Sequence, residues 1–421
     1  MRKIILGVTI TVMSFSTFTA ASAQVFKFKT TCKICTTGSL FGVGQTIIDN
    51  TLQVLVDTAN QSAVDNFGKV LDTKSVFLGA MANAAAGSNK GLAVDYGSNP
   101  SLFVVGGAFG VGANLGSTSI SDLFSGDAFS NFDLQRDGLP ELGGGVNATL
   151  NFGLSLKYFK FLPKIGPVDL KDIVLYFNVL SQDLSTYVSD ASTQGKFFNI
   201  GLNAQYKFMK GKSFGFGALT WGGFDVSTGF NISSLSVAKD IPIDGLLNAP
   251  INDGSTLNDG SGNLVPYELT IGTSANALVG ADVFTFTVPV ELSTNVRLAW
   301  FLTFIGGLGM DFTVGAADLT AKVGGNGTVS YSPLASTKNV GGICNAGTAL
   351  NAVGTDLCNN QDLAELEVTA DISDSGSPNF FDVRPFFGLQ LELYVVKIFM
   401  LANYSAIANT YSFNAGLRVV W

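Results

Sequence analysis

The last thirteen residues alternate so regularly that they limit the fold more than any other feature of the chain. From Asn409 to Trp421, apolar or aromatic residues take every second position, and polar or small residues take most positions between them. Successive side chains of a strand point to opposite faces, and a closed transmembrane barrel needs strands with one lipid face and one lumen face. The pattern predicts the closing strand of a transmembrane β-barrel, with an edge strand of a soluble sandwich as the alternative.

The same strand resembles the C-terminal signal by which the barrel-assembly machinery recognises its clients. That machinery and outer-membrane lipid are therefore the expected partners. The residues that carry the resemblance lie on the apolar face and include the terminal aromatic: Tyr411, Phe413, Leu417, Val419 and Trp421.

The first residues have the pattern of a cleaved export signal. Arg2 and Lys3 precede the apolar run Ile4–Phe18, and the small residues Ala21-Ser22-Ala23 follow. The apolar run is shorter than the roughly 18 to 20 residues of a spanning helix, so an uncleaved anchor is the weaker alternative. We expect a signal peptide over residues 1–23 and export to the bacterial outer membrane. No lipid is expected at the mature N-terminus, because the first cysteine is Cys32.

Composition favours spanning strands over spanning helices. Hydrophobic residues make up 47% of the chain and charged residues 13%, yet beyond the expected signal the best apolar run, Leu298–Met310, is short and contains three glycines. High apolar content without a spanning helix suits a barrel, whose lipid-facing residues occupy every second position. The 49 glycines exceed the average share of about 7%, and in a barrel glycine leaves room in the lumen and forms bulges and turns.

Charge and residue usage exclude several functions. The formal net charge of -8 argues against nucleic acid as a partner. The chain has no histidine, which removes Ser-His-Asp and Cys-His catalysis and imidazole metal sites. We therefore expect no enzyme activity, no metal and no cofactor.

Four cysteines form two close pairs in the sequence. Export into an oxidising compartment favours disulfides, and of three possible connectivities we expect Cys32–Cys35 and Cys344–Cys358. A Cys-x-x-Cys redox site is the alternative for the first pair. That use normally needs a strand-helix context, and none follows here.

Helical periodicity precedes the barrel. Apolar residues recur every three or four positions over residues 45–71, and a second short helix is expected over Ser75–Ala85. Such a helix needs an apolar partner, so it either plugs the lumen, packs below the periplasmic mouth or forms a separate lobe. The candidate plug residues are Ile48, Leu52, Leu55, Val56 and Phe67.

Alternating segments predict about ten strands, or about twelve if the segment 266–299 divides near Asp282. The expected strands are 101–115, 145–158, 172–181, 196–209, 213–233, 266–299, 303–318, 380–394, 397–405 and the closing strand. Long polar loops are expected at 116–142, 182–195, 234–265 and 319–379. Short turns, placed on the periplasmic side, are expected after residues 158, 208, 300 and 394. The expected division is a tail and helical segment at 24–96 and a barrel at 97–421.

Charged residues recur at positions that the alternation turns toward the lumen. They suit either a selectivity ring in a conducting pore or a fixed network that fills a narrow lumen. The candidates are Glu291, Arg297, Asp311, Arg384, Glu392 and Arg418.

The N-terminal helical segment and three further segments, Ala80–Ala85, Gly91–Gly112 and Val288–Arg297, resemble the leptospiral surface-adhesin family of laminin-binding outer-membrane proteins. The resemblance covers most of the mature chain and implies adhesion to extracellular ligands; the lipidated cysteine of the lipoprotein members is missing. A helical segment followed by a barrel is also similar in plan to long-chain fatty-acid transporters, although their proline-rich N-terminal signature is missing. The expected function is a surface-binding or structural barrel without catalysis, and the alternative is a pore for small or apolar solutes gated by the helical segment.

Overall fold

The computed structural model describes most of the expected barrel and part of the segment before it. The described residues are 26–32, 75–97, 102–116, 141–159, 161–166, 168–183, 193–215, 218–242, 250–251, 256–258, 264–333 and 362–421. The expected signal peptide, the plug candidates Ile48, Leu52, Leu55, Val56 and Phe67, and three of the four cysteines, Cys35, Cys344 and Cys358, lie outside them.

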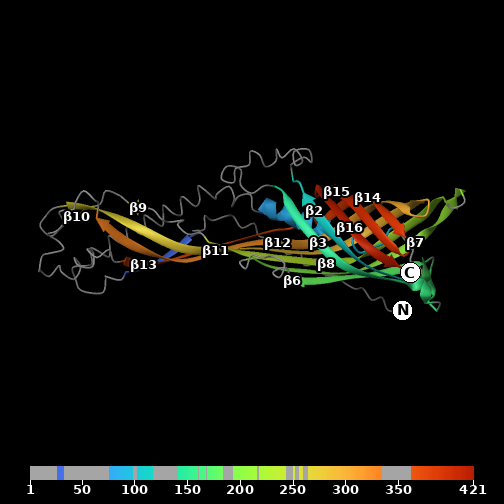
Figure 1. Cartoon of the computed structure of the whole chain (residues 1–421), viewed down its shortest axis with the longest axis horizontal. Coiled ribbons are helices and arrows are strands. Elements are labelled where there is room, and N and C mark those ends of the chain that lie inside the picture. Colours follow the sequence, from blue (N-terminus) through green and yellow to red (C-terminus); the bar gives the residue numbers. More distant parts are fainter. Residues whose placement is uncertain are drawn as a thin grey trace, which may run out of the picture.

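Ten antiparallel strands close into a ring (Figure 1). The ring closes where the last strand pairs with the first, with Val420 opposite Val104. The predicted transmembrane β-barrel is therefore confirmed. In ring order the strands are β2 (Phe103–Asn114), β3 (Gly143–Ser155), β6 (Ile173–Asp183), β7 (Thr193–Phe214), β8 (Leu219–Pro242), β11 (Leu264–Leu298), β12 (Leu302–Pro333), β14 (Phe381–Leu393), β15 (Val396–Ser405) and β16 (Thr410–Val420).

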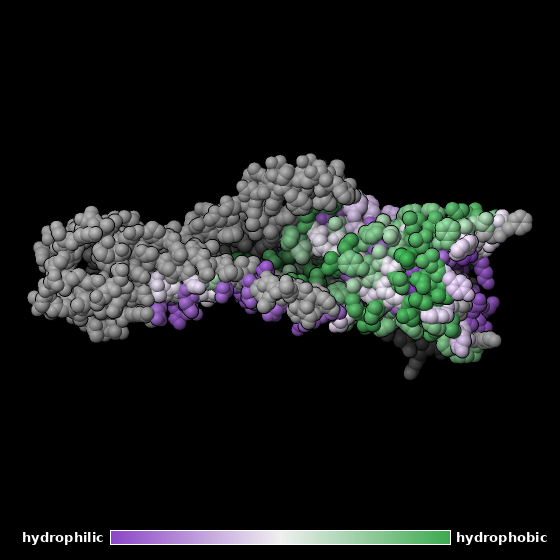
Figure 2. All heavy atoms as spheres, viewed as in Figure 1, coloured by the Kyte–Doolittle hydropathy of each residue, from purple (hydrophilic) through white to green (hydrophobic). Residues whose placement is uncertain are grey.

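Side chains alternate between the outside and the lumen along each wall strand. In β3, Leu150 is 58% exposed, whereas its neighbours Thr149 and Asn151 are buried. The same alternation runs along β14 and β16. Figure 2 shows the outward side chains on one face of the barrel as a hydrophobic band. A closed barrel with an apolar outer band satisfies every backbone hydrogen bond inside lipid, which places this chain in the outer membrane as a β-barrel.

Strand pairing shows whether the segment 266–299 is one strand or two, and it corrects a predicted strand end. The segment 266–299 is the single strand β11, paired with β12 without a break past Asp282, so the ring has ten strands among the described residues. The turn expected after Phe208 is wrong. A bulge between Lys207 and Met209 shifts the alternation there, and β7 continues to Phe214 before a turn at Gly215, whose φ is +56°.

Two predicted loops contain strand. β8 continues to Pro242, and β12 continues to Pro333 and pairs with β13 (Asp362–Gly376). These parts project beyond the hydrophobic band (Figures 1 and 2), where water on both faces removes the need for alternating apolar residues. The predicted loops at 234–265 and 319–379 are wrong in these parts for that reason.

The projecting strands form what we call the strand extension: residues 264–282 of β11, 319–333 of β12, and β13. β1 (Phe26–Cys32) pairs with β13, and the short strands β9 (Pro250–Ile251) and β10 (Thr256–Asn258) pair with β11. Cys32 is the last residue of β1, and its side chain is outside the described set. The two expected disulfides therefore stay predictions.

Turn lengths orient the barrel. The end that carries the C-terminus has the short connections from β7 to β8, from β11 to β12 and from β14 to β15, and short turns lie on the periplasmic side. One longer connection at this end contains η1 (Leu156–Tyr158), β4 (Lys164–Ile165), β5 (Val168–Asp169) and η2 (Leu170–Asp172). The strand extension then lies on the extracellular side.

Aromatic side chains gather at the periplasmic end. Tyr158, Phe161, Trp300 and Tyr394 are exposed there, and the Trp421 ring stacks on Phe103 with 4.4 Å between ring centroids. Such a belt marks the membrane–water interface. Of the residues described, no helix is long and apolar enough to cross a membrane.

Candidate functional site

The lumen of the barrel holds the chain segment that precedes β2. Residues 75–88 form a helix in the extracellular mouth (Figure 1), and residues 89–97, which we call the strap, continue toward the periplasmic end. Leu78, Ala82 and Ala84 of the helix and Leu92 and Asp95 of the strap have no exposed surface. Residues 75–97 thus lie inside the lumen, and we call them the plug for this position. They follow the plug candidates in sequence, and a gating role for the helical segment stays a prediction.

The barrel wall has glycine where the helix lies against it. A Cβ added at Gly110 would overlap the carbonyl of Ser88, and one added at Gly143 would overlap the backbone of Ala80. The same holds for two further wall glycines, Gly112 and Gly145, and for Gly376 at the end of β13. Glycine allows this close backbone approach because it has no side chain. These five glycines therefore make space for the plug.

A buried charge cluster joins the strap to the wall. The Nζ of Lys90 lies 3.0 Å from Asp311 and 3.4 Å from Asp382. Arg384 Nε donates to Asp311 at 3.0 Å, and its Nη2 forms an ion pair with Glu291. These five side chains are all at least nine-tenths buried, so each charge depends on the others for the interactions that water would otherwise supply.

Tyr96 adds a second link from the strap to this cluster. Its hydroxyl donates to Glu291 Oε2 at 2.6 Å, and Ser227 donates to the same oxygen at 2.8 Å. The Tyr96 ring also packs on Phe386, with 5.0 Å between centroids. Because Glu291 accepts from the strap and from the wall together, moving the strap would leave a buried carboxylate short of a donor.

Amide and guanidinium groups hold the backbone of the strap. Asn151 donates to the carbonyl of Leu92 at 2.8 Å, and Arg418 donates to the same carbonyl at 3.0 Å. Arg418 also lies 3.5 Å from Asp95 and stacks over Phe399. An asparagine on the wall, Asn199, donates to Asn89 at 2.9 Å. The strap therefore meets wall groups along its whole length.

The six lumen charges expected from the sequence divide between two places. Glu291, Asp311 and Arg384 are in the buried cluster, and Arg418 holds the strap nearby. Arg297 and Glu392 lie at the periplasmic end, 3.5 Å apart, where Lys397 also contacts Glu392 at 2.6 Å. At both places each of these side chains lies beside a side chain of opposite charge.

Four residues that lie in the cluster or beside it were not predicted from the sequence. Lys90, Asp95, Tyr96 and Asp382 all have polar atoms that bond within the lumen. Lys90 lies in a Gly-Ser-Asn-Lys stretch that is typical of a solvated turn. A signal was present in the wall: Glu291, Asp311 and Asp382 lie at inward positions of three strands, and buried carboxylates need cations beside them.

The space left beside the strap is small. A gap lined by Lys90, Tyr96 and Glu291 has a volume of about 10 Å³, which is the size of one water molecule. Within the described residues no group of three or more histidine, cysteine, aspartate or glutamate side chains is arranged to hold a metal ion.

The predicted C-terminal signal residues lie on the outer face of β16. Phe413, Leu417 and Trp421 are nearly half exposed, and Tyr411 and Val419 are partly buried beside neighbouring strands. Their recognition by the barrel-assembly machinery stays a prediction.

Solved structures with some similarity to this chain are barrels of other kinds. The CymD monoaromatic hydrocarbon channel is 8% identical, with 82% of this chain and 98% of CymD covered and a TM-score of 0.23. The translocator domain of the autotransporter NalP from Neisseria meningitidis is 10% identical, with 85% and 100% covered and a TM-score of 0.24. The Ralstonia pickettii toluene transporter TbuX is 10% identical, with 85% and 99% covered and a TM-score of 0.19. At these scores their activities have no bearing on this chain.

Sequence comparison gives a clear family. No curated protein sequence matches the chain. The model of the Lsa36-like family, however, matches residues 20–421, which includes the plug, the barrel and the strand extension. The chain therefore belongs to the Lsa36-like family.

Proposed function

We propose that this protein is a closed outer-membrane barrel that presents its strand extension at the cell surface to bind extracellular ligands, without catalysis. The observation that carries the proposal is the filled lumen. Residues 75–97 occupy it and are held by buried ion pairs between Lys90 and Asp311 and Asp382.

Opening the lumen would be costly in free energy. Withdrawing the strap would separate Lys90 from two carboxylates and Tyr96 from Glu291. Breaking one buried ion pair costs about 3 to 5 kcal/mol, and each stranded hydrogen-bonding group adds about 1 to 3 kcal/mol. A protein whose task was free diffusion would not need these contacts, whereas a rigid support for a surface structure benefits from them.

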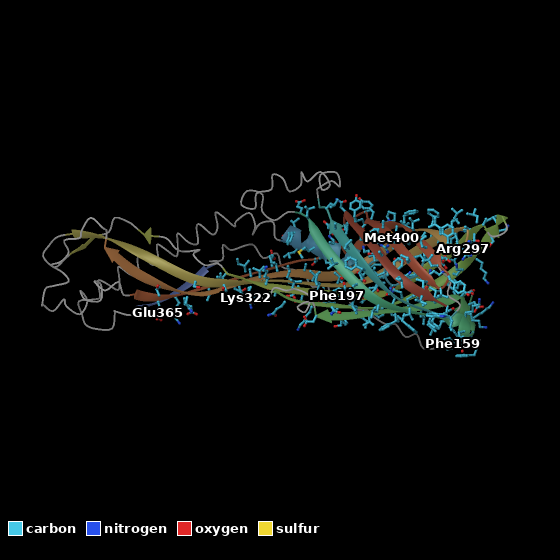
Figure 3. All side chains as sticks on the ribbon, in the orientation of Figure 1. Phe159, Phe197, Arg297, Lys322, Glu365 and Met400 are labelled. Carbon is cyan, nitrogen blue, oxygen red and sulfur yellow. The ribbon has the colours of Figure 1, made fainter. Side chains whose placement is uncertain are left out.

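The strand extension supplies the surface. β11, β12 and β13 project far beyond the barrel (Figure 1), and Figure 3 shows Lys322 and Glu365 on this projection. Lys29 and Glu367, 3.9 Å apart across β1 and β13, are both more than half exposed. Exposed charged side chains on strands also protect an edge from pairing with other chains, so the extension presents a polar surface that stays soluble.

Planar-bilayer conductance tests the closed lumen. The refolded mature chain, residues 24–421, is expected to be silent, and a version that lacks residues 24–96 is expected to show discrete steps because the plug is gone. Heat-modifiable gel migration of both proteins checks that each has folded. Steps from the full chain would overturn the proposal in favour of a pore.

Surface labelling of intact cells tests the orientation. An amine reagent too large for porins is expected to label Lys29 and Lys322 of the extension. It should leave Lys164 and Lys212 at the periplasmic end unlabelled until the cells are lysed. All four side chains are exposed in the structure, so lysed cells serve as the control for reactivity. Labelling of Lys164 and Lys212 before lysis, with Lys29 and Lys322 protected, would show that the barrel is inverted.

A second candidate function is a pore gated by the plug, because the wall behind the plug is polar. Asn147, Asn151, Asn178, Asn199 and Asn203 all point into the lumen and are buried. Such a wall would suit water and polar solutes once the strap had left. Conductance that appears in the full chain only under an applied stimulus would favour this function.

A further inference from the structure

A large cavity opens at the periplasmic end of the barrel, on the opposite side of the plug from the strand extension. Its volume is about 600 Å³, within the range of about 300 to 1,000 Å³ that holds small ligands. Gly97 of the strap and Asn295 of the wall lie in its lining, and Asn295 donates to the carbonyl of Tyr96 at 2.7 Å. The plug thus forms its floor. We call this cavity the basic vestibule; Figure 3 shows Arg297 at this end of the barrel.

Its lining is strongly cationic. Six lysines and Arg297 line it, against two carboxylates, Asp172 and Glu392. The chain as a whole has a formal net charge of -8, so the lining is opposite in sign to the rest of the protein. A concave surface with charges of one sign concentrates the electric field and attracts ions of the other sign.

Internal ion pairs account for only part of this charge. Lys207 lies 3.5 Å from Asp225, and Lys397 and Arg297 both contact Glu392. The remaining lysines include Lys157 from η1 and Lys210 and Lys212 from the end of β7. These three are exposed and have no ion pair with any described residue. Three like charges that share one cavity repel one another, and an anion between them would relieve the repulsion.

We propose that the basic vestibule binds a phosphate-bearing anion. Lysine ammonium groups are compact point charges with three donors each, and they bind phosphate oxygens from several directions. The phosphate can belong to a soluble phosphate compound of the periplasm or to the head group of a lipid in the inner leaflet, which lies at the height of the aromatic belt. The site goes beyond the proposed surface function and does not depend on it, because its cations come from the barrel wall and the periplasmic turns.

Isothermal titration of the refolded mature chain in neutral detergent tests the proposal, with sodium tripolyphosphate as the soluble probe and short-chain phosphatidylglycerol as the lipid probe. Sodium chloride at matched ionic strength corrects for screening. The variant Lys157→Gln/Lys210→Gln/Lys212→Gln is expected to weaken binding about tenfold or more, which corresponds to about 1.4 kcal/mol, because it removes three of the seven cations that line the cavity. The matched control is Lys164→Gln, an exposed lysine at the same end that lies outside the cavity and pairs with Asp169; its binding is expected to match the wild type.

The outcomes separate the two sources of phosphate. Binding of tripolyphosphate that the triple variant loses would establish a site for soluble phosphate compounds, and binding of phosphatidylglycerol alone would assign it to lipid head groups. Trp221, which lines the cavity, gives a local check, since its fluorescence should change on binding and Trp221→Phe should remove that change. If neither probe binds, or if the triple variant and Lys164→Gln bind as the wild type does, the proposal is wrong.

Discussion

Arg384→Met is expected to destabilise the folded barrel by about 3 to 5 kcal/mol, the cost of removing one partner from a buried ion pair. Arg384 has no exposed surface and bonds to Asp311, Glu291 and Asn403. Methionine is similar in length but leaves both carboxylates with fewer partners inside the lumen. Lys90 would then be the cation that remains beside Asp311.

Unfolding in urea, followed by the loss of the faster-migrating folded band, measures this effect. Arg384→Lys keeps the charge but cannot reach Asp311 and Glu291 together with a planar fork, so an intermediate loss is expected. Lys322→Gln, an exposed lysine of the strand extension, should change the unfolding free energy by less than about 0.5 kcal/mol. If Arg384→Met lowers the unfolding free energy by less than about 1 kcal/mol, water reaches the cluster and replaces the lost partner.

Gly143→Leu is expected to press the plug helix away from the wall and to destabilise the folded barrel. A Cβ at position 143 would overlap the backbone of Ala80 and Met81, and the leucine adds three further carbons in the same direction. Overpacking of this kind costs about 1 to 3 kcal/mol. Adding Gly110→Leu, which would overlap Ser88, roughly doubles that cost, because the two sites press on opposite ends of the helix.

The neighbouring residue provides the control. Gly144 faces outward on the same strand, and an added Cβ there meets nothing within 4 Å. Gly144→Leu should therefore change the unfolding free energy by less than about 0.5 kcal/mol, whereas Gly143→Leu/Gly110→Leu should lower it by about 2 to 6 kcal/mol in urea unfolding. An unfolding free energy of the double variant equal to that of the wild type would show that the helix does not need its place against these glycines.

Sequence reasoning succeeded where lipid imposes a rule on every second residue. The outward face of β16 was predicted residue by residue, and β3 and β14 were predicted within a few residues of their observed bounds, because a polar side chain in the hydrophobic band is costly. It failed where that rule does not apply. β13 and the outer parts of β8 and β12 have water around them, so their strand character left no clear pattern. Near Met209 a bulge shifts the alternation, and this shift led to the wrong prediction of a turn after Phe208.

Local alternation is enough to predict the barrel, its closing strand, and the inward direction of Glu291, Asp311, Arg384 and Arg418. The segment that fills the lumen and the partner of each charge follow from the closed ring alone. Lys90 and Asp382 are 292 positions apart, and Tyr96 and Glu291 are 195 positions apart. Such partners come together only when the ring closes around the strap, and no local pattern records that closure. The buried charges then pair with one another, because a charge removed from water is stable only beside an opposite charge or a hydrogen-bonding group. Closure of the ring brings these groups close together.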